Sequence, residues 1–365
     1  MRESGISEEE LFSFLSLKKG EDSRYHHVLS SMCTLPHPVA VRAHQMFIEA
    51  NLGDPGLFRG AASVENLLVE RVGSLLHHPG AGGYATSGGT ESNLQALRIF
   101  RKMKGSRRPN VVVPESAHFS FEKACDILCI EMRTVPCDQT FRMDPDALQE
   151  RLDADTCCIV GIAGTTEYGV VDPIETIAGI AHDHGIPLHV DAAFGGFVIP
   201  FLKRPIPFDF SLPGVASVAV DPHKMGMSTI PCGCLLVREP SWFNLLNVDT
   251  PYLTVKQECT LAGTRSGGAV VGAFAVLEFL GREGMRAVVE GCMKNTARLI
   301  DGMETFGYRR AVTPDLNVAT FEGGAVPPGW QVSWTRRGHM RMVMMPHVHR
   351  SVIEEYLKET GEIHA

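Results

Sequence analysis

The stretch CCIVGIAGTTEYGVVDPIETIAGIAHDHGIPLHV, residues 157–190, decides the fold. Its first six residues are apolar and typical of a buried strand. The tetrapeptide DPIE (172–175) then predicts a helix start, with Asp as the cap, Pro at the first helical position and Glu at the third. Gly185 predicts the left-handed end of that helix, and residues 187–190 predict the next strand. A strand, a helix and a second strand in this order form the unit that builds parallel sheets.

The same alternation continues on both sides of this unit. Further strands are expected at the β-rich runs 111–113, 215–220 and 234–237, and a helical pattern covers residues 119–129. We therefore expect an α/β fold, in which right-handed crossovers build a mainly parallel sheet that helices cover on both faces.

The ends of the chain depart from this pattern. A long helical region runs from about Ala269 toward Phe306, and residues 317–321 and 340–345 beyond it are strand-like. This order predicts a smaller α+β domain at the C-terminus. The chain is therefore expected to have three parts: an N-terminal arm over residues 1–45, a large cofactor-binding domain over 46–285 and a small domain over 286–365.

Length and composition limit the class of protein. The 365 residues are 44% hydrophobic and 21% charged, which excludes general disorder. A formal charge of −8 disfavours nucleic acid and anionic membranes as partners. The sequence has no run of about 18 apolar residues, so no membrane span is expected. Without a signal-peptide pattern at the start, the ten cysteines indicate reduced thiols in a cytoplasmic protein.

The first of four chemical motifs is TSGGTESN (86–93), which runs directly into a helical pattern. Glycines and small hydroxyl residues at a helix N-terminus surround an anion with free backbone N–H groups. A plain Ser/Thr cap with a glycine turn is the alternative. The loop has neither the Gly-Lys-Ser/Thr end of a Walker loop nor the GxGxxG spacing of a dinucleotide-binding loop.

Two further motifs follow strands, where an open α/β sheet places its ligands. In HVDAAFG (189–195), Asp191 can pair with a cationic ring nitrogen and the small Ala193 leaves room for a flat ring; a turn-capping Asp is the alternative. In DPHKMG (221–226), apolar surroundings favour Lys224 as a desolvated amine that forms a Schiff base, rather than as a solvated surface lysine.

The fourth motif, Ser116-Ala117-His118, follows the strand expected at 111–113. Its imidazole can stack on an aromatic cofactor, although a capping histidine is the commoner case. An anion cup, an acid for a ring nitrogen, a stacking ring and a Schiff-base lysine, in this chain order, together indicate a site for pyridoxal phosphate.

These motifs resemble a known family. SGGTESN (87–93), the triplet DAA (191–193) and the pair HK (223–224) are similar to the fold-type I, group II pyridoxal-phosphate decarboxylases, and most of all to the archaeal tyrosine/aspartate decarboxylases of methanofuran and coenzyme A biosynthesis. Four further stretches support the likeness: TLPHP (34–38), NLGDPG (51–56), GTTE (164–167) and LAGTRSG (261–267). The likeness spans about residues 34–268 and fades toward the C-terminus.

The resemblance implies how the cofactor is held. Lys224 forms the internal aldimine, Asp191 pairs with the protonated pyridine nitrogen, and His118 stacks on the ring. The other implied cofactor contacts are Ala193 beneath the ring, Thr165 or Thr166 at the ring hydroxyl, and Ser87, Gly88, Gly89, Thr90 and His223 at the phosphate. Asp221 stands where other relatives carry Asn, and an aspartate beside a phosphate needs a compensating donor.

The resemblance also implies a reaction: decarboxylation of L-aspartate to β-alanine, or of L-tyrosine to tyramine, through the Lys224 aldimine and a quinonoid intermediate. Arg265 is implied to bind the substrate carboxylate, and His37 to line the substrate pocket. Tyr252 is the candidate donor of the Cα proton, with a packed aromatic as the alternative role and His223 as the fallback donor. A homodimer is implied, because sites of this family lie at subunit interfaces.

Several questions stay open at this stage. The choice among aspartate, tyrosine and glutamate depends on which cation reaches the cleft, and the candidates for a second cation are Arg24, Arg42, Arg336 and Arg337. The alternative function is another fold-type I lyase, either a cysteine desulfurase or an aldol lyase acting on phosphorylated sphingoid bases. A desulfurase needs a nucleophilic cysteine late in the chain, whereas the last one here, Cys292, falls in an expected helix.

A metal-binding protein is the alternative from a different class. The three candidate ligand pairs are Cys232 with Cys234, His182 with His184 and His347 with His349. The members of each pair are too close in sequence, and too far from further ligands, for a tetrahedral site. No metal is therefore expected.

Overall fold

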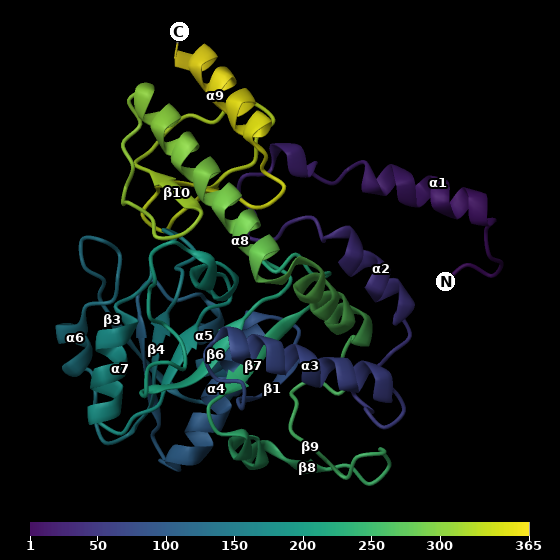
Figure 1. Cartoon of the computed structure of the whole chain (residues 1–365), viewed down its shortest axis with the longest axis vertical. Helices are drawn as coiled ribbons and strands as arrows, with labels where there is room; N and C mark the ends of the chain where they lie inside the picture. The colour runs from purple at the N-terminus through teal and green to yellow at the C-terminus, as the bar shows by residue number, and fades with distance from the viewer. Residues whose placement is uncertain (365) are drawn as a thin grey trace.

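The computed structural model describes residues 1–364, with the side chain of His364 left aside. A large α/β body carries a smaller unit at one end, and the long helix α8 (Gly267–Thr305) runs from the first into the second (Figure 1). Helix α9 (Arg350–His364) packs beside the second half of α8 in this smaller unit.

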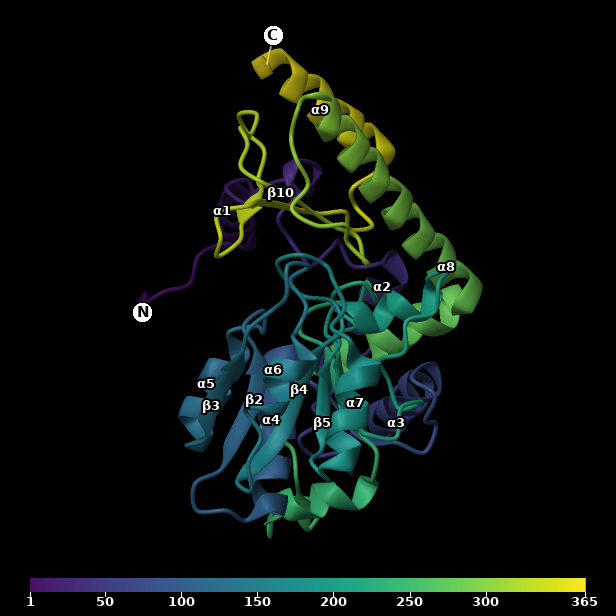
Figure 2. The ribbon, with the colours of Figure 1, turned by 90° about the vertical axis from the view of Figure 1, so that its left-hand side faces the viewer.

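The body is organised around one seven-stranded sheet with the strand order β1-β7-β6-β5-β4-β2-β3. Figure 2 shows its strands β3, β2, β4 and β5 next to one another. Neighbours from β3 through β6 pair in parallel, whereas β7 is antiparallel to both β6 and β1. The strands are β1 Gly82–Thr86, β2 Asn110–Pro114, β3 Glu131–Val135, β4 Thr156–Ile162, β5 Leu188–Asp191, β6 Val215–Val220 and β7 Gly233–Val237. The expected α/β fold with a mainly parallel sheet is confirmed.

Helices cover both faces of this sheet. The helices of the body are α2 Pro38–Met46, α3 Arg59–Leu75, α4 Gly89–Lys104, α5 Ser120–Leu128, α6 Pro145–Gln149 and α7 Ile174–Asp183. Helices α4 and α5 share one apolar core with the sheet, whereas α3, α7 and the first half of α8 share another. The side chains of β4 alternate between these cores, since Val160 faces α4 and Ile159 faces α7. Burial on both faces explains why β4 reads as an unbroken apolar run.

The strand-helix-strand unit of residues 157–190 folds as expected except at the start of its helix, which begins at Ile174, so that Pro173 is the N-cap and not the first helical residue. Gly185 follows α7 with a φ of 62°, as the left-handed end requires. Asp172 does not cap the helix. Its carboxylate accepts hydrogen bonds from the backbone N–H groups of Met143 (2.9 Å) and Ile162 (2.8 Å), and burial raises its pKa to about 6. The side chain therefore ties two neighbouring segments together instead of starting α7.

The sequence pattern did not predict two strands of the sheet, β1 and β3. The other expected strands lie within β2, β4, β5, β6 and β7, and the helical pattern at 119–129 is α5. The long helical region is α8, but Gly281 interrupts it with φ 58° and ψ −170°.

The smaller unit has its own sheet, of order β10-β12-β11, whose strands are β10 Val318–Phe321, β11 Ser333–Trp334 and β12 Met340–Val343. Its core joins α8 and α9 through Met303, Phe321 and Tyr356, and includes Leu29 from the N-terminal segment. The predicted boundaries at residues 45 and 285 stay a prediction.

Two features lie at the periphery, one helix and one hairpin. Helix α1 (Glu8–Lys19) has no buried residue and stands away from the body. The short strands β8 (Val248–Asp249) and β9 (Gln257–Glu258) form a projecting hairpin. Elsewhere in the structure, the 3-10 segments are η1 Tyr25–His27, η2 Gly195–Phe197, η3 Ile199–Phe201 and η4 Pro240–Leu246. Within residues 1–364, every helix is too short or too polar to cross a membrane, and all ten cysteines are free thiols.

Substitution of two glycines of α8 by alanine should change the free energy of unfolding in opposite directions. The φ and ψ angles of Gly281 are essentially restricted to glycine, and a Cβ there would meet no atom within 4 Å. Gly281→Ala should therefore lower the free energy of unfolding by about 1 kcal/mol or more, through backbone strain alone. Gly291→Ala, in equally open space but within the helical part, should raise it by about 0.5–1 kcal/mol. Urea unfolding at fixed cofactor concentration measures both, and effects of the same sign would contradict this account of the interruption.

Candidate active site

One cavity of about 350 Å³ lies where β4, β5 and β6 end and α4 begins. This is the carboxyl edge of the parallel strands, where open α/β sheets bind their ligands. The cavity is lined by Ser87, Gly88, Gly89, Thr90, Asn93, His118, Ile162, Gly164, Thr166, Asp191, Ala193, Phe194, Asp221, His223 and Lys224.

The turn from β1 into α4 forms one wall of the cavity. The backbone N–H groups of the first helical turn, at Gly89 and Thr90, lack acceptors within the helix. The N–H of Ser87 is already taken by the Glu91 carboxylate (2.8 Å), which holds the turn in place. Gly88 needs its glycine backbone, since its φ is 152° and a Cβ would lie 3.1 Å from the His223 ring. The wall is thus a shallow cup of N–H and hydroxyl donors, suited to an anion.

A buried carboxylate, Asp191, stands at the end of β5. One of its oxygens accepts a hydrogen bond from the Asn93 amide (2.9 Å), and the other accepts one from the Ala193 N–H (3.0 Å). Asn93 comes from the second turn of α4, so the helix that forms the cup also orients the acid. A buried carboxylate held by two donors, with lone pairs left toward the cavity, is suited to pairing with a cationic N–H.

Behind this pair lies a fully buried imidazole, His189. Its Nε2 lies 2.9 Å from Asn93 Oδ1, and its Nδ1 lies 2.7 Å from Ser217 Oγ. Because Asn93 donates its amide N–H to Asp191, its Oδ1 must accept, so His189 carries its proton on Nε2 and Nδ1 accepts from Ser217. Burial lowers the pKa of His189 to about 4, which keeps the ring neutral at physiological pH.

Lys224 and Asp221 face the cavity from the turn after β6. The Lys224 ammonium lies 3.1 Å from Asp221 Oδ2, and its side chain is 21% exposed. Burial by itself lowers the pKa of Lys224, but the carboxylates of Asp221 and Asp191 outweigh it and leave the pKa raised. The second oxygen of Asp221 is buried without a hydrogen-bond partner among the described residues. The lysine is thus the compensating cation that an aspartate in this place requires.

His118 also lines the cavity. Its Nδ1 accepts a hydrogen bond from the Ser120 N–H (3.2 Å), which leaves the proton on Nε2 when the ring is neutral. Burial lowers the pKa of His118, so the ring is a neutral, flat surface. The sequence motif located this residue correctly at the cavity.

Pyridoxal phosphate fits this set of groups. The cup after β1 offers donors to a phosphate, and Asp191 offers an acceptor to a pyridinium N–H. The glycine backbone at Gly88 and Gly89 keeps the cup open, because a Cβ at Gly89 would lie 3.0 Å from Ala193 and 3.2 Å from Asp221. His118 and Ala193 offer flat and small surfaces for a ring, and Lys224 offers the amine.

Four of the predicted site residues lie outside this cavity. Thr165 is buried and accepts from the Val170 N–H, whereas its neighbour Thr166 lines the cavity. The His37 ring caps α2 by accepting from the Val39 N–H (3.2 Å). Tyr252, in the hairpin turn, is 86% exposed.

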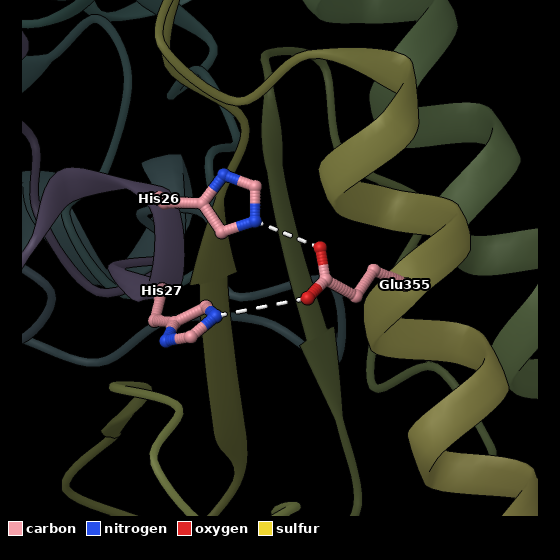
Figure 3. A group of neighbouring side chains, drawn as sticks. All are labelled: His26, His27 and Glu355. Atoms are coloured by element: carbon pink, nitrogen blue, oxygen red, sulfur yellow. Dashed lines mark hydrogen bonds and ion pairs between the residues drawn. The ribbon is translucent and has the colours of Figure 1, made fainter.

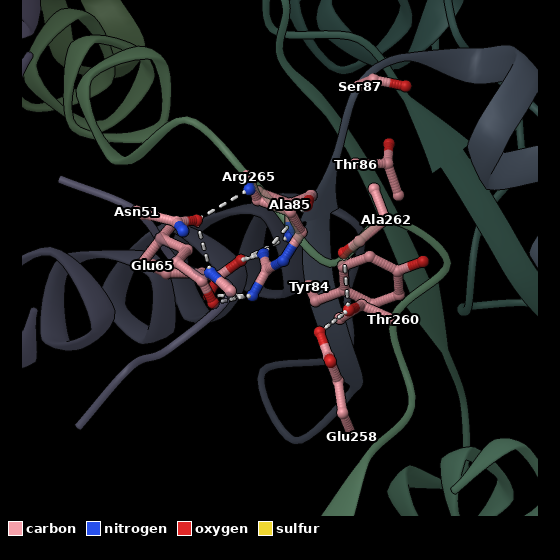
Figure 4. A network of polar contacts seen from close by, with 12 residues as sticks. Asn51, Glu65, Tyr84, Ala85, Thr86, Ser87, Glu258, Thr260, Ala262 and Arg265 are labelled. Atoms are coloured by element: carbon pink, nitrogen blue, oxygen red, sulfur yellow. Dashed lines mark hydrogen bonds and ion pairs between the residues drawn. The ribbon is translucent and has the colours of Figure 1, made fainter. Parts of the chain in front are cut away.

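Arg265 is the fourth, and the structure argues against its implied role in binding a substrate carboxylate. Its guanidinium forms an ion pair with Glu65 of α3 and donates to the carbonyl of Ala85 (3.1 Å), as Figure 4 shows. It also donates to the carbonyl of Leu52 (3.0 Å). Glu65 also accepts from the Ala85 N–H (2.9 Å). Arg265 therefore braces β1 just before the anion cup, and its charge is already neutralised.

Sequence reasoning missed two residues that the geometry singles out. Asn93 belongs to the motif TSGGTESN, from which no separate role was predicted for it, although its amide orients Asp191. Arg341 of β12 is buried and donates to the carbonyl of Thr166 (2.5 Å), next to the cavity. Its Nη2 is buried without a partner among the described residues, and burial lowers its pKa to about 10. An arginine inside a strand was the available signal, since buried arginines are rare unless paired.

Arg341 itself does not line the cavity but contacts the lining residue Thr166, whereas the other arginines raised by the sequence neither line the cavity nor contact Thr166. Arg336 donates to the carbonyls of Glu115 and Ala117, and Arg337 pairs with the Glu115 carboxylate. Arg24 and Arg42 are exposed.

Comparison with known proteins agrees with this geometry. Residues 60–312 match the pyridoxal-dependent decarboxylase conserved domain. Two similar relatives, both called probable L-tyrosine/L-aspartate decarboxylase, come from Methanoculleus marisnigri (66% identity over 365 residues, all of both chains) and Methanosphaerula palustris (64% over 363 residues, 99% of this chain and all of the other).

Solved structures show the same architecture. A sphingosine-1-phosphate lyase from Burkholderia pseudomallei superposes with a TM-score of 0.91 at 27% identity, over 99% of this chain and 91% of the other. A glutamate decarboxylase from Lactobacillus brevis superposes with a TM-score of 0.90 over 99% and 93%, but at 21% identity it shows the fold alone.

Fold, cavity and family match together define a pyridoxal-phosphate enzyme of the α/β type. Within that class, the chain belongs to the pyridoxal-dependent decarboxylase family, and its reaction is the pyridoxal-phosphate-dependent decarboxylation of an amino acid.

The neutral His189 predicts a pH dependence of stability. Its folded pKa of about 4 lies below the ordinary value of 6.5, so the unfolded chain binds more protons between these values and stability falls as the pH falls. Protonation of this residue should therefore lower the free energy of unfolding by about 2 kcal/mol between pH 7 and pH 5. In urea unfolding, the free energy of unfolding of His189→Asn should fall less between pH 7 and pH 5 than that of the parent protein, by the same amount. The exposed His182→Asn serves as control; an unchanged loss in His189→Asn would contradict the assignment.

Proposed function

We propose that this protein removes the α-carboxylate of L-aspartate, L-tyrosine or both, giving β-alanine and tyramine. The observation that carries the proposal is the meeting of the Lys224 amine and the Asp191 carboxylate in one cavity that ends at the N-terminus of α4. Full-length relatives at 66% and 64% identity bear the corresponding name, which favours this reaction over the aldol cleavage of the more distant lyase.

We propose the following roles for the residues at the cavity. Pyridoxal phosphate, when bound, supplies an aldehyde for the amine and a conjugated ring that accepts the electrons of the broken Cα–carboxylate bond. Asp191 would hold the ring N–H, and Asn93 with His189 would keep that carboxylate in place. Ser87, Gly88, Gly89, Thr90 and His223 would hold the phosphate, with Thr166 at the ring hydroxyl. Lys224 would supply the amine after its ammonium has passed a proton to the Asp221 carboxylate, which lies 3.1 Å away.

Arg341, rather than Arg265, is proposed to bind a substrate carboxylate. Its unpartnered Nη2 and its bond to the Thr166 carbonyl support this role, because a buried guanidinium with a free N–H is a strong carboxylate donor. Its pKa of about 10 keeps it charged at neutral pH.

We propose that the active form is a homodimer in which a second copy completes the site. Tyr252, the proposed Cα proton donor, is solvent-exposed on a projecting hairpin and does not line the cavity of its own chain, an arrangement that favours service to the cavity of a second copy. Helix α1 supports the same conclusion, since it exposes Phe12, Phe14 and Leu17 with none of its residues buried. Exposed apolar faces of this kind are typical of surfaces that bury against a partner.

The products fit a biosynthetic role in the cytoplasm. β-Alanine and tyramine are the precursors that coenzyme A and methanofuran synthesis would require from such an enzyme. The ten free thiols support a reducing compartment.

The function is tested by measuring carbon dioxide release from L-aspartate, L-tyrosine and L-glutamate. Lys224→Ala should lose the cofactor's absorbance band and at least about 10³-fold in activity, as expected when a covalent catalyst is removed. Lys203→Ala, at an exposed position, should change neither. Release from neither aspartate nor tyrosine by the coloured parent protein would refute the substrate proposal.

Substitution of Arg341 tests the carboxylate role. Arg341→Met should raise KM by about tenfold or more while the absorbance of the bound cofactor is retained, and Arg341→Lys should restore part of the loss. Arg336→Met, which removes an exposed arginine bound to the carbonyls of Glu115 and Ala117, is the matched control. A folded Arg341→Met variant with unchanged KM would refute this assignment.

A further inference from the structure

Two adjacent histidines and one glutamate contact one another at the surface, and none of them lines the active-site cavity. His26 and His27 form part of η1, and Glu355 lies on α9, 329 positions beyond His26. Figure 3 shows both imidazoles directed at the same carboxylate, with the dashed contacts leading to its two oxygens. The sequence gives no sign of this cluster, because its members belong to opposite ends of the chain.

We propose that His26, His27 and Glu355 form a binding site for a divalent transition metal, with zinc as the expected ion. Two imidazole nitrogens and one carboxylate are borderline ligands, which favour zinc, cobalt or nickel over magnesium or calcium. Both histidines present Nε2, and the side chains are between 42% and 50% exposed. An ion can therefore enter from solvent, and water can complete its coordination.

The distances suit such an ion after small side-chain movements. His26 Nε2 lies 2.7 Å from Glu355 Oε2, His27 Nε2 lies 3.8 Å from Oε1, and the candidate ligand atoms all lie within 4.8 Å of one another. Bonds of about 2.0–2.2 Å in a tetrahedron separate ligand atoms by about 3.3 Å. The first contact must lengthen and the second shorten by about half an ångström, and the widest separation, which is up to 4.8 Å, must shorten by about 1.5 Å at most. Rotation of the exposed side chains supplies these movements.

An ion here would tie together the two ends of the chain. Residues 25–34, called the strap, begin at the cluster and pass beside Arg341. The Gln331 N–H donates to the His27 carbonyl (2.8 Å), and the Val343 N–H donates to the Leu29 carbonyl (2.7 Å). Further along, the Ser30 carbonyl accepts from Arg341 Nη1 (3.1 Å). A metal at the cluster would therefore fix the strap on α9 and so support the position of Arg341.

A tryptophan beside the cluster provides a reporter. The ring of Trp330 lies 4.7 Å from the ring of His27 and 6.4 Å from that of His26. Its Nε1 donates to Glu359 (2.7 Å), which fixes its orientation. Bound cobalt or nickel should quench the fluorescence of this side chain.

The test uses untagged, cofactor-loaded protein that is stripped with a chelator and then equilibrated with zinc. Elemental analysis after dialysis should find one zinc per chain, and the ion should raise the midpoint of thermal unfolding by about 3 °C at saturation. Cobalt should quench part of the tryptophan fluorescence, and Trp330→Phe should remove that part.

Variants separate this site from adventitious binding. His26→Asn with His27→Asn should abolish zinc retention and the thermal shift, and Glu355→Gln should weaken binding by about tenfold or more. His182→Asn with His184→Asn, an exposed pair at the end of α7, should retain both. Absence of bound zinc in the parent protein, or equal retention by the His26/His27 variant, would overturn the proposal and leave only an ion pair at this place.

Discussion

The buried carboxylate of Asp191 is the constraint on which the site depends. A carboxylate removed from water is costly unless donors replace the lost hydration. The Asn93 amide and the Ala193 N–H supply two such bonds, and the neutral His189 holds Asn93 from behind. Because the donors come from α4 and from the turn after β5, the acid, the anion cup and the sheet edge must be assembled together.

The topology explains how distant parts of the sequence reach one cavity. The carboxyl ends of β4, β5 and β6 share one edge, which places Asp191 beside Lys224. The antiparallel pairing of β7 with β1 brings the start of α4 to the same edge. The buried ion pair of Glu65 and Arg265 then anchors β1 just before the cup, so it serves the architecture of the site and not the substrate.

Much of this fold was predictable, for a physical reason that also marks the limit. Strands such as β4 and β6 are apolar and buried on both faces, so their pattern is visible in the sequence. Strands β1 and β3 are GGYAT and EMRTV, whose glycines and partly exposed polar residues carry no such pattern. Site residues that follow strands were located, whereas Asn93 and Arg341 depend on side-chain geometry. Asp172 has the sequence context of a helix cap, but two N–H groups from other segments bind it instead.

The central claim is that the Lys224 amine, facing Asp191, is the group that bonds to the cofactor aldehyde. The most direct measurement is borohydride reduction of the cofactor-loaded protein, which makes that linkage permanent, followed by peptide mass mapping. The account predicts one phosphopyridoxyl group per chain, on Lys224. A label on another lysine, such as Lys123 near His118, or no label on a coloured protein, would contradict it.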